Sequence, residues 1–74
     1  MKGGIQSEIS AAEAEISELI EKNIAINLKL QDQENKPTWQ VKMKFIGERA
    51  INTARIRALM FLIAERKEDL GTEV

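Results

Sequence analysis

Apolar residues in the first half of the chain recur at alternating steps of three and four residues. The positions that follow this spacing are Ile9, Ala12, Ile16, Leu19, Asn23, Ile26 and Leu30. Such a repeat forms a continuous seam along one side of a helix and is typical of helices that pack lengthwise. The pattern predicts a helix over about residues 7–30, with one polar residue inside its seam.

Two serines offer a start for this helix, Ser7 and Ser10. Residues 10–13 read Ser-Ala-Ala-Glu, the capping-box pattern in which serine and glutamate satisfy each other's free backbone N–H groups. Gly3 and Gly4 are adjacent, so we expect the residues before Ser7 to fray.

Several apolar residues of this region fall outside the seam, namely Ile5, Ile20, Ile24 and Leu28. They widen the apolar surface beyond what a single partner helix covers. We therefore expect more than one neighbouring helix.

The segment QDQENKPT at residues 31–38 is polar and contains the one proline of the chain. Proline disfavours helix in the residue before it and suits the first turn of a new helix. A connection of this length joins antiparallel neighbours in helical bundles. We predict a turn over about residues 31–37 and a second helix from about Thr38 to about Leu70, with Gly71 as its stop.

The second helix carries a broad apolar surface interrupted by two polar residues. Its central stripe comprises Ile46, Arg49, Thr53, Ile56, Met60 and Ile63. Flanking apolar residues are Ala50, Ala54, Ala58, Leu59, Phe61, Leu62 and Ala64. The last third of this helix is thus apolar nearly all round, which one hairpin cannot cover. The predicted fold class is all-α: an antiparallel two-helix hairpin, a single domain over residues 1–74, that assembles into a homo-oligomeric helical bundle.

Composition narrows the class of protein. A domain of this size buries only about 60% of its unfolded surface, so it usually needs disulfides, a metal or oligomerisation. The chain has no cysteine and no histidine, which excludes disulfides, disfavours the commonest transition-metal sites and rules out Ser-His and Cys-His catalysis. No glycine-rich phosphate loop follows a strand. We expect no enzyme activity, no cofactor and no metal.

The sequence shows no signal-peptide pattern and no membrane span. Residues 1–10 lack an apolar core, and the longest apolar run, residues 58–64, is far shorter than the roughly 20 residues that a bilayer requires. We expect a soluble, cytoplasmic protein that does not contact a membrane.

The net charge of −1 hides an uneven distribution of charge. Residues 8–21 contain five glutamates and no base, whereas residues 36–57 contain six bases and one glutamate. Either an acidic helix lies beside a basic one, or part of the basic group meets an anionic ligand.

Arg49 and Thr53 form the main candidate constellation. Being four residues apart, they lie on one side of the helix and can reach one target. Their stripe becomes purely apolar one turn later, so we expect them near an interface or a symmetry axis. A charge buried there must be paired: Arg49 forms a salt bridge with a first-helix glutamate such as Glu18 or Glu21, or converging copies hold a shared anion.

Other residues have two interpretations each. Asn23 fixes the register or oligomeric state, or contacts a ligand. Trp39, the only tryptophan, forms a hydrophobic lid on the hairpin end or stacks on a nucleobase. Phe45 lies off the central stripe and serves an interface or a stacking surface. The nearby lysines, Lys36, Lys42 and Lys44, form a solvated basic edge or contact phosphate.

The segment IGERAINTARIRAL at residues 46–59 resembles the small phage proteins known as anti-CBASS sponges, which bind the cyclic oligonucleotide signals of bacterial antiphage immunity. Members of that family are short helical proteins that form compact homo-oligomers, including hexamers. The residues that carry the resemblance are Ile46, Gly47, Arg49, Ile51, Thr53, Ala54, Ala58 and Leu59. It implies that Arg49 and Thr53 hold the phosphates of a cyclic trinucleotide around a threefold axis, with Ile46 and Ala50 in the wall.

The family also has a separate cyclic dinucleotide pocket that uses an aromatic residue near the N-terminus and a lysine. No aromatic residue precedes Trp39, so a trinucleotide is favoured over a dinucleotide. Lys22 and Lys29 are candidates for the lysine, and Trp39 and Lys42 are further candidate ligand contacts.

Three functions remain open. The first is a phage-encoded, non-enzymatic sponge in the host bacterial cytoplasm that forms a dimer, trimer or hexamer, sequesters a cyclic oligonucleotide and so permits immune evasion. The second is a small nucleic-acid-binding helical bundle, in which residues 36–57 track a phosphate backbone; the negative net charge disfavours it. The third is an oligomeric adaptor or inhibitor that binds another protein.

Overall fold

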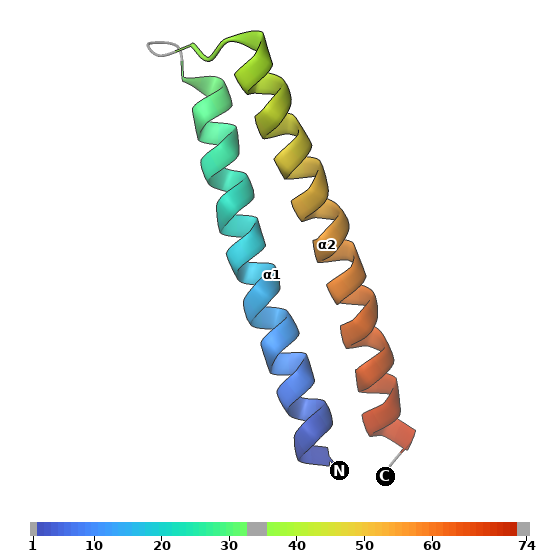
Figure 1. Ribbon diagram of the computed structural model, residues 1–74. Helices are drawn as coiled ribbons and strands as arrows, with labels where there is room; N and C mark the ends of the chain where they lie inside the picture. Colours follow the sequence, from blue (N-terminus) through green and yellow to red (C-terminus); the bar gives the residue numbers. More distant parts are fainter. Residues whose placement is uncertain (1, 33–35, 73–74) are drawn as a thin grey trace.

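A computed structural model of the chain describes residues 2–32 and 36–72. It contains two long helices, α1 (Lys2–Gln31) and α2 (Trp39–Thr72). They lie side by side and run in opposite directions, so the start of α1 lies beside the end of α2 (Figure 1). The described residues contain no strand. The prediction of an all-α helical hairpin is confirmed.

Helix α1 begins earlier than predicted. It is helical from Lys2 onward, so the expected start at Ser7 or Ser10 is wrong. Residues 2–6, where fraying was expected, are part of the helix, and Met1 lies outside the described residues. The physical reason lies in the seam, which continues one turn back from Ile9 to the half-buried Ile5. Packing at this position offsets the cost of about 1 kcal/mol for a glycine within a helix.

Thr38 caps the start of α2. Its Oγ1 accepts a hydrogen bond from the backbone N–H of Val41 at 3.4 Å, and its carbonyl accepts one from the N–H of Lys42 at 2.9 Å. These bonds satisfy N–H groups that the first helical turn leaves without a partner. The predicted helix start near Thr38 therefore has a local cause.

The expected stop at Gly71 is wrong. Helix α2 continues to Thr72, and none of the described glycines adopts the left-handed conformation that a helix-ending glycine uses. Leu70 is half-buried, so packing against α1 holds the last turn in helical form.

The seam predicted on α1 is confirmed. Ile9, Ala12 and Ile26 are buried, with at most 7% of their surface exposed. The other members are half-buried, namely Ile16, Leu19, Asn23 and Leu30. Of the apolar residues predicted outside the seam, Ile20, Ile24 and Leu28 are between 44% and 64% exposed. Ile5 is half-buried and continues the seam, so its predicted place outside the seam is wrong.

The face of α2 that meets α1 is rotated from the predicted stripe. It is formed by buried and half-buried residues spaced four and three apart: Phe45, Arg49, Asn52, Ile56, Leu59, Ile63, Arg66 and Leu70. Ile46 and Met60, predicted within the central stripe, are 40% and 58% exposed. Three residues of this face are polar, namely Arg49, Asn52 and Arg66. The most apolar side of α2 is therefore not the side that packs against α1, which is why the predicted stripe was centred incorrectly.

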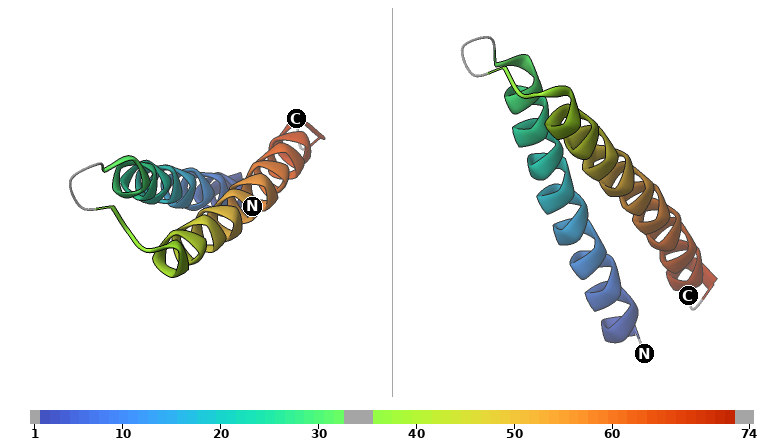
Figure 2. Two further views of the ribbon diagram at one scale, coloured as in Figure 1. Left: turned by 90° about the horizontal axis from the view of Figure 1, so that it is seen from above. Right: turned by 45° about the horizontal axis from the view of Figure 1, so that its top comes forward.

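The hairpin is thin and long. It measures 56 × 15 × 13 Å, with a radius of gyration of 16.8 Å, against about 11 Å for a compact domain of this length. The two further views show the same pair of rods from other sides (Figure 2). Within the described residues, the buried core consists of Ile9, Ala12, Ile26 and Leu59. So small a core leaves much apolar surface exposed.

Large hydrophobic side chains lie on the surface of both helices. The exposed ones on α2 are Trp39, Val41, Met43, Ile46, Ile51, Met60 and Phe61. Met60 and Phe61, in the last third of α2, are 58% and 67% exposed, which confirms that the hairpin alone does not cover this part. Despite this surface, neither helix has a stretch long and apolar enough to cross a membrane within the described residues.

Candidate ligand site

Five polar side chains meet in the half of the hairpin nearer the connection between the helices, and we call them the polar layer. Asn23 and Asn27 come from α1, whereas Arg49, Asn52 and Thr53 come from α2. All five are half-buried. Because the asparagines of α1 are one turn apart, they face one antiparallel turn of α2.

Arg49 has no carboxylate partner among the described residues. Its Nη1 donates a hydrogen bond of 2.6 Å to Oδ1 of Asn27. The alternative of a salt bridge to Glu18 or Glu21 is wrong, and Glu18 instead lies 3.6 Å from Lys22 Nζ. A guanidinium has five N–H donors, and this contact uses one of them. Its charge and its remaining donors can therefore serve an anion.

Thr53 is bonded in two directions. Its Oγ1 donates to the carbonyl of Arg49 at 2.8 Å and accepts from Nδ2 of Asn23 at 3.4 Å. Oδ1 of Asn23 in turn accepts from Nδ2 of Asn52 at 3.0 Å. The single hydroxyl proton of Thr53 is thus engaged within its own helix, so donation to a ligand requires an exchange of partners.

Nearer the chain ends, arginines on α2 meet glutamates on α1. Arg55 Nε lies 2.7 Å from Glu15 Oε2, and Arg66 Nε lies 2.7 Å from Glu8 Oε2. The hydrogen bond from Arg55 lowers the pKa of Glu15, and the same bond raises the pKa of Arg55. Part of the uneven charge of the sequence is therefore paired within the hairpin, because acidic α1 lies beside basic α2.

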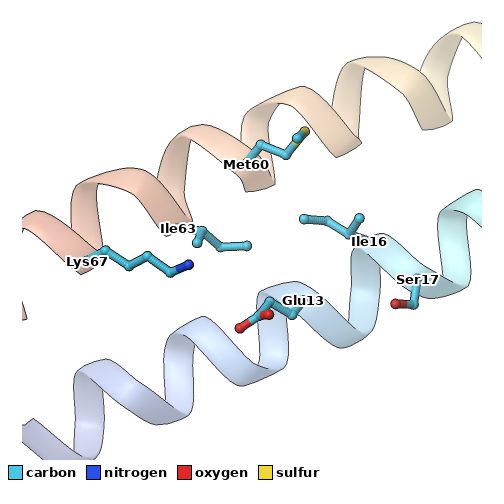
Figure 3. Close-up of a pocket in the computed structure, with 6 residues that line it drawn as sticks. All are labelled: Glu13, Ile16, Ser17, Met60, Ile63 and Lys67. Atoms are coloured by element: carbon cyan, nitrogen blue, oxygen red, sulfur yellow. The ribbon is translucent and has the colours of Figure 1, made fainter.

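A groove of about 370 Å³ lies between the helices and is lined by Glu13, Ile16, Ser17, Met60, Ile63 and Lys67. Ile16 and Ile63 point toward one another across it, and Glu13 and Lys67 extend toward each other (Figure 3). The groove places Ile16 and Met60 on the same side of the hairpin. The two ion pairs between α1 and α2 line a different groove.

The side that carries this groove is apolar over much of its length. On α2, Ile46, Thr53 and Met60 follow one another at seven-residue intervals, so they lie on one line along the helix. On α1, the exposed residues Ile20 and Ile24 follow Ile16 at four-residue intervals, so these three lie along one side of the helix. We define the apolar side by Ile16, Ile20, Ile24, Ile46, Ala50 and Met60. Arg49 lies at its border, one turn from Thr53.

The additional candidate residues do not join the polar layer. Lys29 Nζ lies 5.4 Å from the centre of the Phe45 ring, within reach of a cation–π interaction, and Lys22 lines the same groove. Trp39 is 72% exposed, so the expected lid is wrong, because α1 ends before it reaches the first turn of α2. Lys42 lines a polar groove beside the connection between the helices.

Sequence reasoning overlooked two members of the polar layer, Asn27 and Asn52. A signal was present, because each lies next to or one turn from a recognised polar residue in a largely apolar stretch. Asn27 follows Asn23 by one turn, and Asn52 precedes Thr53. Pairing such interruptions between the two predicted helices would have located the layer.

The polar layer and the adjoining apolar side are the candidate site, with Arg49 as the candidate anion contact. Comparison with known proteins adds no residue to it. No protein-family model, curated protein or solved structure matches the chain.

Proposed function

We propose that this chain is a non-enzymatic protein that self-assembles and sequesters a cyclic oligonucleotide, a trinucleotide in preference to a dinucleotide. The observation that carries the proposal is Arg49, a half-buried arginine whose described side-chain partner is a neutral amide. A partly desolvated charge without a counterion is unfavourable, and a phosphate can accept two parallel N–H bonds from a guanidinium. The resemblance of residues 46–59 to anti-CBASS sponges supplies the ligand class and the setting, a phage-infected bacterium.

The exposed apolar side supports this function, because it offers a surface on which copies of the chain can pack. Ile46 and Ala50 are exposed beside Arg49, so packing of copies on this side would bring several guanidinium groups together. Converging positive charges repel one another, and a cyclic ligand with several phosphates would remove that repulsion. The small core of the hairpin gives a separate reason for assembly, since a domain of this size rarely reaches adequate stability alone.

The decisive experiment is calorimetric titration of the protein with cyclic trinucleotides, cyclic dinucleotides and the matching linear trinucleotides. We expect binding of a cyclic trinucleotide, and loss of that binding in Arg49→Ala with retention of helical circular dichroism. The matched control is Arg55→Ala, which removes the same charge from α2 but at the groove lined by the ion pairs. If no cyclic oligonucleotide releases or absorbs heat, the proposed function is wrong.

Assembly is tested separately by sedimentation velocity. Met60→Lys places a charge on the apolar side and should shift the protein to smaller species. Ala25→Lys introduces the same side chain on the exposed surface of α1 beside a different groove and should leave the mass unchanged. A wild-type monomer at micromolar concentration would contradict the assembly.

A protein-binding adaptor is the second candidate, favoured by the exposure of Trp39, Ile51 and Phe61 at 72%, 70% and 67%. Aromatic residues such as Trp39 and Phe61 are enriched in protein interfaces. Light scattering separates the candidates, because a closed sponge is monodisperse, whereas an adaptor with open apolar surface associates progressively as its concentration rises.

A further inference from the structure

The contact between Asn27 and Arg49 joins the two helices at the candidate site. Nη1 of Arg49 donates to Oδ1 of Asn27 over 2.6 Å, and both side chains are half-buried. A hydrogen bond with one charged partner is shorter and stronger than a neutral one. It therefore restricts an arginine side chain that otherwise has many rotamers.

The chemistry of the acceptor distinguishes this arginine from Arg55 and Arg66 of α2. An amide oxygen fixes the guanidinium without neutralising it, whereas the carboxylates of Glu15 and Glu8 meet Arg55 and Arg66 with opposite charge. Asn27 leaves the Nε and Nη2 donors of Arg49 without a partner in the described residues. This is the pair of parallel donors that a phosphate can engage side-on.

The backbone beneath the guanidinium is tied to α1 as well. Thr53 donates to the carbonyl of Arg49, and Asn23 bonds to Thr53 and to Asn52. Asn27 therefore holds the side chain of Arg49, and Asn23, one turn away on α1, holds the turn of α2 that carries it.

We propose that Asn27 is the positioning residue of the ligand site: it orients the guanidinium of Arg49 toward phosphate and preserves its charge. The inference rests on the proposed function and adds a residue of α1 to the phosphate contact that the sequence assigned to Arg49 and Thr53 of α2. It makes phosphate binding depend on the register of the hairpin, because a slip of α1 past α2 separates the two side chains.

Three variants test the role in the full chain. Asn27→Ala removes the acceptor, Asn27→Asp keeps an acceptor but adds a carboxylate, and Gln31→Ala removes an exposed amide one turn further along α1 as a matched control. We expect a loss in affinity for the cyclic trinucleotide of about 10-fold to 100-fold in Asn27→Ala, the usual range for a hydrogen bond to a charged group. Gln31→Ala should bind as the wild type does.

The aspartate variant separates positioning from mere support of the fold. If Asn27 only stabilised the hairpin, Asn27→Asp, which can pair with Arg49, would retain stability and affinity together. We expect it to keep its thermal midpoint but to lose affinity for the ligand, with a smaller dependence of binding on salt, because the guanidinium is already neutralised. Wild-type affinity in Asn27→Asp would overturn the inference.

Side-chain NMR of Arg49 in the ligand-free protein gives a second readout. The hydrogen bond should slow rotation of the guanidinium and separate its two Nη signals, and Asn27→Ala should merge them. If the wild type binds no cyclic oligonucleotide, the proposed function fails and the ligand role of Asn27 fails with it, whatever the NMR shows. If the wild type binds and Asn27→Ala binds equally well, the positioning inference alone is overturned.

Discussion

The interface between α1 and α2 is built differently in the half that holds the chain ends and in the half nearer the connection. Toward the chain ends, Ile9, Ala12 and Leu59 are buried at 2%, 4% and 4% exposure, and the nearby arginines pair with glutamates at 2.7 Å. Nearer the connection, an arginine meets an asparagine, and the buried Ile26 lies in the same turn of α1. The same residue type is thus neutralised in one region and only oriented in the other.

This difference indicates what each region contributes. Burial of apolar side chains near the chain ends is non-directional and provides most of the stability of such a hairpin. The polar layer contributes less to stability, since a hydrogen bond gained on folding replaces one made to water. Its bonds are directional, so it favours one alignment of the helices and one orientation of Arg49.

The largest effect on the free energy of unfolding is expected for a buried apolar residue in the half that holds the chain ends. Leu59→Ala should lower the free energy of unfolding by about 2–4 kcal/mol, because it removes buried methyl groups and leaves a cavity. The measurement is urea unfolding followed by circular dichroism at fixed protein concentration. Ile51→Ala is the control, because Ile51 is 70% exposed on the same helix, and it should change stability far less. If both variants lowered the free energy of unfolding equally, the assignment of Leu59 to the buried core would be wrong.

A smaller effect is expected in the polar layer. Asn23→Ala removes the bonds to Thr53 and Asn52 and should lower the free energy of unfolding by about 1 kcal/mol, the usual net value for a partly buried hydrogen bond. The same urea titration measures it. Asn23→Leu should recover or exceed wild-type stability while allowing alternative alignments, visible as additional NMR signals. A single set of signals in Asn23→Leu would contradict the role of the layer in register.

Sequence reasoning succeeded where the apolar repeat had a single polar interruption. The seam of α1 keeps its heptad spacing over seven positions with one polar residue, so its pattern identified the buried face correctly. On α2 the seam includes Arg49, Asn52 and Arg66, and the apolar residues Ile46 and Met60 lie beside it. The hydrophobic signal was therefore strongest next to the true interface.

The candidate site was predictable only in part, for a related reason. Arg49 and Thr53 could be placed on one helical side from spacing alone. Asn27 could not be assigned to Arg49 without the register of α1 against α2, which spacing within one helix does not provide. The choice of an amide rather than Glu18 or Glu21 as partner depends on that register too.

The smallest effect is expected at the exposed ion pairs, and it should depend on pH. Arg55 holds the pKa of Glu15 below its ordinary value of 4.5, so folding favours the ionised carboxylate. Its contribution is therefore fully present above that value and is lost as the pH falls through the lower pKa of the folded state. Thermal unfolding from pH 6 downward should show the decline, and added salt should weaken it because both side chains are exposed.

A matched pair of variants attributes this decline to one contact. Glu15→Gln and Arg55→Gln should each remove the same part of the pH dependence, and the double variant should remove no more, because both changes break one interaction. Arg49→Gln should leave the pH dependence intact, since the described partner of Arg49 is an amide that does not titrate in this range. If Arg49→Gln also flattened the profile, an unrecognised carboxylate would be its partner, and the distinction between neutralised and merely oriented arginines would fail.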